Sequence, residues 1–247
     1  MKVAGKIVVV TGAAQGIGAA LAARFAQEGA EAVVAADIKP GAGIVPCDVS
    51  REDDIARLID DTESRIGPID LFCSNAGIAV LDPDWDNPAS APDEGWARSW
   101  VVNVMAHVWA ARHLVPRMTA RGGGYFLHTV SAAGLLSQIG SGPYSATKHA
   151  ALGFAENLAI AGRDRGVKVS VLCPQGVDTA MLAGIDRGVP DGDGVLTAEA
   201  VADAVVAGLD AEQFLILPHP AVATYFRRKA DDYDRWLGGM ARLRRSM

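Results

Sequence analysis

The sequence has no long, uninterrupted apolar run. Hydrophobic residues make up 50% of the chain, yet no stretch reaches the roughly eighteen uncharged apolar residues that a membrane span requires. The first residues, Met1–Lys6, lead directly into an apolar run and do not resemble a signal peptide. We therefore expect a cytoplasmic protein without a membrane span.

Cysteine and histidine are also scarce. Cys47, Cys73 and Cys173 are widely spaced, and each lies in or beside an apolar run. This pattern favours buried free thiols over disulfides or metal ligands. The five histidines are scattered without metal-ligand spacing, so we expect no metal site.

Positive charge is in deficit, because 23 Lys and Arg residues face 29 Asp and Glu residues, for a net charge of −6. This balance argues against nucleic acid as a partner. Residues 221–247 are the exception and carry a net +4. At 247 residues the chain can bury a full core. We expect one domain over residues 1–220 and a basic helical extension over residues 221–247, packed on that domain or on a dimer partner.

A glycine-rich turn follows the first apolar run. Residues 6–10 are typical of a buried parallel strand, and a helical pattern extends from the turn to residue 29. Glycines permit the tight turn and let backbone N–H groups approach a pyrophosphate at a helix N-terminus. The spacing is GxxxGxG rather than GxGxxG, so it fits the plain dinucleotide fingerprint imperfectly. The candidate cofactor contacts in this turn are Gly12, Gln15, Gly16, Ile17 and Gly18.

The second expected strand, Ala32–Asp37, ends in an acid about twenty residues beyond the glycine turn, where a carboxylate can accept hydrogen bonds from a ribose diol. The same carboxylate would repel a 2′-phosphate, so Asp37 favours NAD over NADP. Lys39 opposes this preference, because its ammonium could attract the phosphate. The alternative is that Asp37 is a surface turn residue without a ligand.

Strands and helices alternate along the rest of the chain, which predicts an α/β fold: a doubly wound sheet of about seven mostly parallel strands, with helices on both faces. A third short run, Ile44–Cys47, follows so closely that we expect no helix before it. Later strands are expected at Ile69–Ser74, Tyr125–Val130, Val167–Cys173 and Phe214–Leu217. Helices are expected at Ser50–Ile66 (capped by Ser50), Asp93–Ala120, Pro143–Gly166 (Ser141 and Gly142 as caps), Thr197–Leu209 (capped by Thr197) and from Ala221 onward.

Two connecting segments have the composition of functional loops. Ile78–Gly95 is rich in Pro, Asp and Asn, and it follows a strand at the edge where the substrate cleft should open. Ala180–Leu196 is rich in Gly, Asp and Pro and has the composition of a mobile lid.

Tyr144 and Lys148 are four residues apart on an expected helix, so they share one face. A free tyrosine has a pKa near ~10, and a lysine ammonium one turn away favours the phenolate and lowers that pKa. Ser131 ends the preceding strand and adds a hydroxyl that can hold a substrate oxygen. Together they predict a proton-transfer site for an alcohol or a carbonyl. A lone YxxxK pattern is more often an exposed, uncoupled pair. Other features of the sequence are therefore needed to distinguish a proton-transfer site from such a pair.

The chain resembles the short-chain dehydrogenase/reductase family over residues 5–217. Asn103, Ser131, Tyr144 and Lys148 match the catalytic tetrad of the family in order and spacing, with Ser131 28 positions after Asn103 and 13 before Tyr144. The resemblance implies a Rossmann-type fold in which Tyr144 is the base in oxidation and the acid in reduction. Lys148 would lower the pKa of Tyr144 and bind the nicotinamide ribose. Ser131 would position the substrate oxygen, and Asn103 would hold a water that links Lys148 to solvent.

The same resemblance extends the expected cofactor site. The turn Thr11–Gly18 matches the cofactor motif of the family. Asn75, Ala76 and Gly77 match the motif that supports the central sheet and the adenosine side, Asp48 and Val49 the pair that contacts adenine, and Thr179 the residue that holds the nicotinamide carboxamide. Pro174, Val177, Tyr144 and Lys148 complete the expected cofactor contacts.

The chain departs from the pattern of the family in four places. The helix after the second strand is missing, which opens the adenosine side, and the loop Ile78–Gly95 is a few residues longer than usual. Gln175 follows Pro174 where relatives usually have Gly, so its side chain could face the substrate. The usual C-terminal end, which builds a tetramer interface in many relatives, is replaced by Leu217–Pro220 and the basic extension. We expect a homodimer or a homotetramer, with dimerisation through helices 93–120 and 143–165.

These observations predict an NAD-dependent oxidoreductase that transfers a hydride between nicotinamide C4 and a secondary alcohol or ketone. The alternative is a catalytically silent NAD(H)-binding sensor or scaffold, which only Gln175 and the altered C-terminus favour. A mostly apolar substrate is suggested by residues near the expected cleft, namely Trp85, Leu135, Leu136, Ile139, Met181 and Leu182.

Apolar residues recur at helical spacing in the basic extension, for example at Trp236, Met240 and Leu243. We expect this face to pack on its own subunit or on a dimer partner. Binding to a membrane surface or another partner is the alternative.

Overall fold

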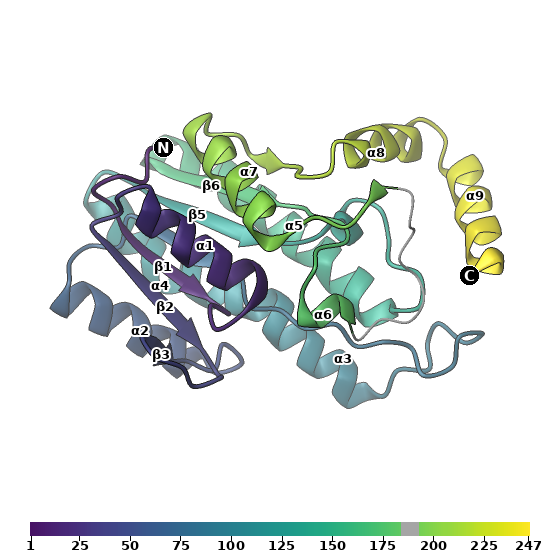
Figure 1. Ribbon diagram of the computed structural model, residues 1–247, viewed down its shortest axis with the longest axis horizontal. Helices are drawn as coiled ribbons and strands as arrows, with labels where there is room; N and C mark the ends of the chain where they lie inside the picture. Colours follow the sequence, from purple (N-terminus) through teal and green to yellow (C-terminus); the bar gives the residue numbers. More distant parts are fainter. Residues whose placement is uncertain (184–192) are drawn as a thin grey trace.

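A seven-stranded β-sheet forms the centre of the protein (Figure 1), in the order β3-β2-β1-β4-β5-β6-β7. The computed structural model describes residues 1–183 and 193–247. Every neighbouring pair of strands is parallel. This confirms the predicted doubly wound, Rossmann-type α/β fold.

The strand order places a topological switch at the middle of the sheet. From β1 the chain builds outward through β2 and β3, and it then returns to add β4 on the other side of β1. Ligands of open α/β sheets bind beyond the carboxyl ends of the strands at such a switch. The strands are β1 (Ile7–Thr11), β2 (Ala32–Asp37), β3 (Ile44–Pro46), β4 (Leu71–Ser74), β5 (Gly124–Thr129), β6 (Val167–Leu172) and β7 (Leu215–Ile216).

Helices cover both faces of the sheet, and each face has its own cluster of buried apolar side chains. Helices α1 (Gly16–Gln27) and α7 (Ala198–Asp210) pack on one face. Helices α2 (Glu52–Arg65), α4 (Ala106–Ala120) and α5 (Gly142–Gly162) pack on the other. Strands β1 and β4 are buried along their whole length, as expected of strands that are covered on both sides.

The expected long helix over residues 93–120 is not continuous. It consists of α3 (Asp93–Trp100), a π-helical turn (Val101–Met105) and α4. A π-helical turn shifts the backbone hydrogen bonds by one residue, and such turns are frequent at functional sites. The turn contains Asn103, one of the predicted site residues.

The expected single C-terminal helix is also wrong, because the extension forms α8 (Ala221–Asp231) and α9 (Tyr233–Ser246). Asp232 separates them with an extended backbone (φ −155°, ψ 94°), and its carboxylate accepts a hydrogen bond from the backbone N–H of Arg235. Asp232 therefore ends α8 through its extended backbone and caps α9 through its side chain. Both helices lie at the end of the molecule away from the N-terminus (Figure 1).

The predicted cap at Ser50 is wrong, and the cap at Thr197 is confirmed. Ser141 occupies the N-cap position of α5 as predicted, but its side chain makes no cap hydrogen bond. The hydroxyl of Ser50 donates to Asp48 Oδ1 at 2.7 Å, and α2 begins after Arg51 without a side-chain cap. The hydroxyl of Ser141 donates to the carbonyl of Val80 rather than capping α5. The hydroxyl of Ser50 is thus bound within its own turn, and that of Ser141 by the loop after β4. Thr197 caps α7 as predicted, since its hydroxyl accepts from Ala200 N at 3.1 Å.

Two connecting segments can be compared with their predictions, namely residues 38–43 and residues 180–196. Residues 38–43 contain no helix between β2 and β3, as predicted. The expected lid, Ala180–Leu196, begins with the short helix α6 (Ala180–Ala183), and residues 184–192 lie outside the described residues.

The three cysteines are buried free thiols, as predicted. No helix in the described ranges has the length and apolar character needed to cross a membrane.

The glycine turn after β1 leads to a test of the fold. A Cβ atom on Gly18 would collide with the carbonyl of Gly12 and the side-chain amide of Asn75. We expect Gly18→Ala to lower the free energy of unfolding by about 2 kcal/mol, the usual effect of overpacking a tight site. Urea denaturation measures it.

The control is Gly153→Ala in α5, where a Cβ atom would meet nothing within 4 Å. That substitution should raise the free energy of unfolding by about 1 kcal/mol, because Ala is the better helix former. Equal urea midpoints for Gly18→Ala and the wild type would contradict the close approach in the turn.

Candidate active site

A large cleft of about 1460 Å³ opens at the carboxyl ends of the central strands. Its walls come from the segments that follow β1, β2, β3, β4, β5 and β6, together with α6 and the two C-terminal helices. The cleft therefore lies at the topological switch, where the fold predicts a ligand. All the predicted site residues line it except Asn103.

The glycine turn and Asn75 build one side of the cleft. Gly12 has a φ of +68°, and a Cβ atom on it would lie 2.8 Å from Ala76 Cα, so the two loops touch through their backbones. The Asn75 amide donates to Thr11 O at 3.0 Å, and its oxygen accepts from the Thr129 hydroxyl at 3.0 Å. Asn75 thereby joins the carboxyl ends of β1, β4 and β5.

Helix α1 begins directly after this turn without a capping side chain. Gln15 stands at the cap position and makes no side-chain cap hydrogen bond, and the first turn contains no acid. The free backbone N–H groups and the positive end of the helix dipole therefore face the cleft. This arrangement suits a phosphate group.

Asp37 is buried at the end of β2 with its carboxylate held in place by the backbone. Its two oxygens accept hydrogen bonds from Ala14 N at 3.0 Å and from Lys39 N at 2.8 Å. An ionised carboxylate has about four acceptor positions, so lone pairs remain for ribose hydroxyls. The Lys39 ammonium donates to Gln15 Oε1 at 2.9 Å, beside the glycine turn.

Asp48 and Val49 lie in the turn after β3, at the far end of the same side of the cleft. Asp48 Oδ1 accepts from the backbone N–H and the hydroxyl of Ser50, at 2.9 and 2.7 Å. Its own backbone N–H donates to Asp54 Oδ2 at 3.1 Å. These bonds set the turn that brings Asp48 and Val49 to the cleft.

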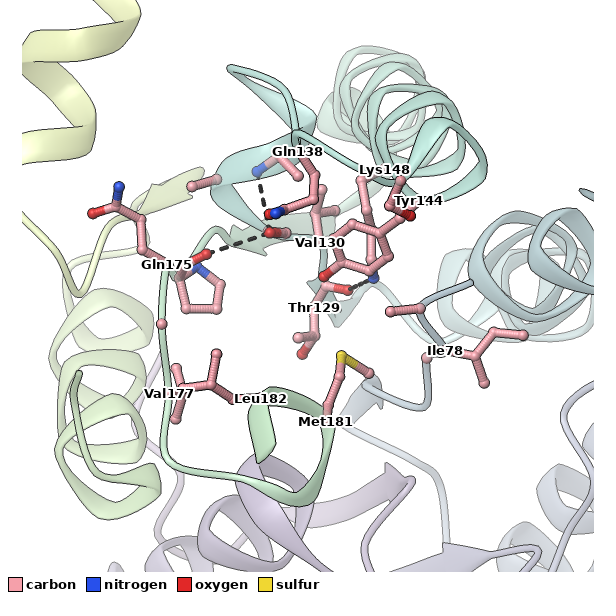
Figure 2. Close-up of a pocket in the computed structure, with 18 of the residues that line it drawn as sticks. Ile78, Thr129, Val130, Gln138, Tyr144, Lys148, Gln175, Val177, Met181 and Leu182 are labelled. Atoms are coloured by element: carbon pink, nitrogen blue, oxygen red, sulfur yellow. Dashed lines mark hydrogen bonds between the residues drawn. The ribbon is translucent and has the colours of Figure 1, made fainter. Parts of the chain in front are cut away.

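Tyr144 and Lys148 lie side by side on another wall of the cleft (Figure 2). Ser131 lines the same cleft and is hydrogen-bonded to Tyr144. Lys148 is 3% exposed, its ammonium donates to Thr129 O at 3.1 Å, and it lies 5.4 Å from the centre of the Tyr144 ring. The hydroxyl of Ser131 accepts from Ala133 N at 3.1 Å. The structure thus brings together Ser131 from the segment after β5 and two residues of α5, and all three line the cleft.

The electrostatics of this group differ from the sequence expectation. Burial raises the pKa of Tyr144 above its usual value, although a hydrogen bond with Ser131 opposes the shift. Burial also lowers the pKa of Lys148 to about 8. Desolvation of the phenol is the largest cause of the shift, so the net pKa of Tyr144 in the protein alone is raised rather than lowered. The prediction that Lys148 favours the phenolate stays a prediction.

Asn103 lies behind the cleft rather than in its wall. Its side chain is fully buried, accepts from Ile78 N at 2.9 Å, and donates to Ile78 O at 2.9 Å and to the Thr147 hydroxyl at 3.1 Å. A Cβ atom on Gly77 would lie 3.3 Å from Asn103 Oδ1 and 3.4 Å from Lys148 Nζ. Asn103 and Lys148 therefore flank one glycine. The predicted water beside Asn103 remains a prediction.

Gln175 differs from its expected orientation. Its side chain lies at the edge of the cleft and points away from Tyr144 (Figure 2). Its backbone N–H donates to Nδ1 of the buried His219 at 3.1 Å. Sequence reasoning missed His219, although its place between two prolines after the last strand was an available signal.

The wide end of the cleft is partly apolar. Of the six residues that were expected there, four line it, and Trp85 and Leu135 stand outside the lining. Sequence reasoning did not find that the C-terminal helices line the same cleft with Tyr225, Trp236, Met240 and Leu243. The four predicted apolar residues in the lining are Leu136, Ile139, Met181 and Leu182.

Among residues 1–183 and 193–247, no group of three His, Cys, Asp or Glu side chains could hold a metal ion.

Comparison with known proteins places this site in context. Residues 6–189 match the model of the short chain dehydrogenase family. The chain is 38% identical to 1-deoxy-11-beta-hydroxypentalenate dehydrogenase of Streptomyces exfoliatus, over 92% of this chain and 88% of that protein. It is 33% identical to epidermal retinol dehydrogenase 2 of Mus musculus, over 87% of this chain and 75% of that protein.

Two solved structures of short-chain dehydrogenases are also similar to the chain. One is from Burkholderia phymatum in complex with NAD, with a TM-score of 0.83, 29% identity and coverage of 95% of this chain and 96% of that chain. The other is from Burkholderia cenocepacia in complex with NADP, with a TM-score of 0.80, 26% identity and coverage of 97% of this chain and 99% of that chain.

The buried Lys148 predicts a pH dependence of stability. Below pH 8 it is protonated in both states, and the folded state carries the full cost of burying its charge. Between pH 8 and 10.5 the folded protein releases the proton first, so stability rises with pH in this window. Relative to Lys148→Met, the wild type should gain up to about 3 kcal/mol across the window.

Urea denaturation at several pH values measures this difference. Lys168→Met removes a lysine whose side chain is 52% exposed, and it reports the general effect of losing one positive charge. If the free energies of unfolding of the wild type and Lys148→Met differ by the same amount from pH 7 to 10.5, burial does not lower the pKa of Lys148.

Proposed function

The chain belongs to the short-chain dehydrogenase/reductase family, and we propose that it is an NAD-dependent oxidoreductase that acts on a secondary alcohol or ketone. The observation that carries this proposal is the meeting of Ser131, Tyr144 and Lys148 in one cleft with the uncapped start of α1. A hydroxyl, a phenol and an ammonium at one wall suit proton transfer. The free helix N-terminus at the other wall suits a diphosphate.

The residues of the cleft fit a dinucleotide. The backbone contact between Gly12 and Ala76 leaves no room for larger side chains at the turn. Gly16 has a φ of +57°, and a Cβ atom on it would lie 3.1 Å from the Thr179 side chain, so the start of α1 and the proposed carboxamide-binding residue are neighbours. Asp37, Asp48 and Val49 are proposed to hold the adenosine part.

Asp37 supports NAD over NADP. Its carboxylate is buried and oriented by two backbone N–H groups, so it cannot easily turn away from a 2′-phosphate. Lys39 is engaged with Gln15, which weakens the argument that it would attract that phosphate. The two similar solved structures contain NAD and NADP respectively, so membership of the family does not decide the preference.

The mechanism follows from the positions of the three side chains. The nicotinamide would supply hydride transfer at its C4 position. Ser131 would hold the substrate oxygen, and Tyr144 would move the proton on that oxygen. Burial keeps Tyr144 neutral in the protein alone, which suits donation during reduction. Oxidation needs the phenolate, which the positive charges of Lys148 and of an oxidised nicotinamide ring would both favour.

The lining of the cleft supports an apolar substrate. Leu136, Ile139, Met181 and Leu182 face the space next to the proposed reacting group. Two of the relatives are named for 1-deoxy-11-beta-hydroxypentalenate and for retinol. We therefore propose that the substrate is an alcohol or ketone on an apolar carbon skeleton.

A homodimer is the proposed assembly. Ile160 on α5 is 77% exposed and Trp100 on α3 is 47% exposed. A dimer through α5 and the helix pair α3 and α4 would remove these large apolar side chains from water.

Removing the Tyr144 hydroxyl tests the proposed chemistry. We expect Tyr144→Phe to lower kcat by at least about a hundredfold, because the proton on the substrate oxygen has no other carrier. NADH binding should stay within a factor of about two, since the ring that packs in the site is kept. Tyr125→Phe is the control, because that hydroxyl bonds to Ser170 outside the cleft. Full turnover by Tyr144→Phe would exclude the proposed acid and base.

Titration with NADH and NADPH, followed by nicotinamide fluorescence, tests the proposed cofactor. We expect the wild type to bind NADH at least about tenfold more tightly, and Asp37→Ala to narrow or reverse that ratio, since the carboxylate both binds the diol and repels the phosphate. Asp164→Ala removes the same charge from an exposed position outside the cleft. Tighter NADPH binding by the wild type would overturn the preference. Tight NADH binding without oxidation of any alcohol would favour the silent sensor.

A further inference from the structure

Lys229 on α8 is a buried lysine at the edge of the cleft. Its side chain is 5% exposed, and its ammonium donates to Leu135 O at 2.8 Å and to Leu136 O at 2.7 Å. No carboxylate within the described parts of the chain pairs with it. Burying an ammonium that has no paired carboxylate costs free energy unless other polar groups replace its hydration. The groups around Lys229 must therefore take the place of water.

Those surroundings present electron-rich groups to the ammonium. The two carbonyls follow the 3₁₀ turn Ala132–Gly134, and carbonyls at the end of a helical turn lack partners within it. The rings of Tyr233 and Trp236 lie 5.4 and 5.1 Å from the ammonium, within range of a cation–π interaction. Lys229 therefore joins α8 to the segment after β5 and is itself covered by the first turn of α9.

A third contact joins Lys229 to α5. His149 Nε2 lies 3.4 Å from the ammonium, and His149 Nδ1 lies 2.8 Å from Ser145 O. A ring nitrogen that faces a carbonyl must carry the hydrogen, which leaves Nε2 as an acceptor. His149 is the neighbour of Lys148. One lysine of the extension thus holds the segment between Ser131 and Tyr144 and the helix that carries Lys148.

The other end of the extension is also attached. Arg244, in the last turn of α9, donates to Trp85 O and to Asp86 Oδ1, and its guanidinium lies 5.4 Å from the Trp85 ring. A Cβ atom on Gly140 would lie 2.7 Å from that ring, so Trp85 packs on the segment after β5. The C-terminal helices, the loop after β4 and the segment after β5 therefore contact one another in a closed ring.

Between these two attachments α9 faces the cleft. Trp236, Met240 and Leu243 share one face of the helix and line the cavity. This face lines the same cavity as Tyr144, and the contacts of Lys229 and Arg244 attach the extension at its two ends. The extension is thus placed where it would contact the skeleton of a bound alcohol.

We propose that Lys229 is a positioning residue for substrate: by binding the Leu135 and Leu136 carbonyls, it holds the C-terminal helices as a wall of the substrate cleft and fixes the segment between Ser131 and Tyr144. The apolar face of α9 then takes part in selecting an apolar alcohol. This inference rests on the proposed function for its catalytic consequence. The attachment itself does not depend on it.

Hydrogen exchange measured by mass spectrometry tests the attachment without any substrate. In Lys229→Met, amides of residues 131–143 and 233–246 should exchange at least about tenfold faster, as the loss of two charge-assisted hydrogen bonds implies. Amides of β1 and β4 should be unchanged. Arg227→Met is the matched control, because Arg227 is an exposed neighbour that does not line the cleft. Wild-type exchange in both segments of Lys229→Met would overturn the proposal.

Arg244→Gln provides the same test from the other end of the extension. Arg244 is half-buried and does not contact Lys229, so the substitution leaves the Lys229 contacts in place and the variant should fold even if Lys229→Met does not. Amides of residues 80–90 and of the last two turns of α9 should then exchange faster. Unchanged exchange in both would contradict the closed ring.

Steady-state kinetics test the consequence for substrate. A panel of cyclohexanol, 2-octanol and borneol with NAD identifies an alcohol that the wild type oxidises. For that alcohol, Lys229→Met should raise KM at least about tenfold while kcat and the Kd for NADH change less than about threefold, because a misplaced wall weakens binding without removing the reacting groups. A fall in kcat alone would indicate a merely structural role and overturn the proposal. Absence of turnover by the wild type counts against the proposed function, and hydrogen exchange still decides the attachment.

Discussion

The side chain of Asn75 joins the two sides of the cleft, and the rest of the site depends on it. Its amide binds Thr11 beside the glycine turn, and its oxygen binds the hydroxyl of Thr129, whose carbonyl accepts from the Lys148 ammonium. A continuous series of hydrogen bonds therefore runs from the nucleotide side to the reacting side across three parallel strands. Because each partner is buried or half-buried, the loss of any one would leave polar groups unsatisfied. The spacing between the glycine turn and the side of the cleft that carries Lys148 is thus fixed by the sheet.

Burial without neutralising acids is a recurrent feature of this cleft. Lys148 donates to a carbonyl, Lys229 donates to two carbonyls and lies near two aromatic rings, and neither pairs with a carboxylate among the described residues. Burial lowers the pKa of Lys148 to about 8, which is closer to neutral pH, so the charge of Lys148 depends on its surroundings. The Lys229 ammonium holds two segments together that are far apart in the sequence. Burial of an unpaired ammonium therefore accompanies a shifted pKa at Lys148 and a contact between distant segments at Lys229.

Local patterns predicted much of this protein. The parallel sheet, the missing helix before β3 and the Thr197 cap follow from strand runs, loop lengths and capping chemistry, each read within a few residues. The predicted cap at Ser50 was wrong, because α2 begins one residue later and Asp48 binds the hydroxyl. Ser141 holds the predicted cap position, but its hydroxyl binds the distant loop at Val80. The π-helical turn at Asn103 and the break at Asp232 were also missed, since the composition of the surrounding residues remains compatible with a continuous α-helix.

The sequence by itself determined the fold, the family and the set of residues that can meet at the cleft, because strand and turn patterns and the spacing of Ser131, Tyr144 and Lys148 are local properties. The tertiary structure alone sets the direction in which the pKa of Tyr144 shifts, the place of Asn103 behind Gly77 and the part that the C-terminal helices take in lining the cleft. Burial depends on what the whole chain packs around a group, and the contact between Lys229 and Leu135 joins residues 94 positions apart. No local pattern carries either kind of information.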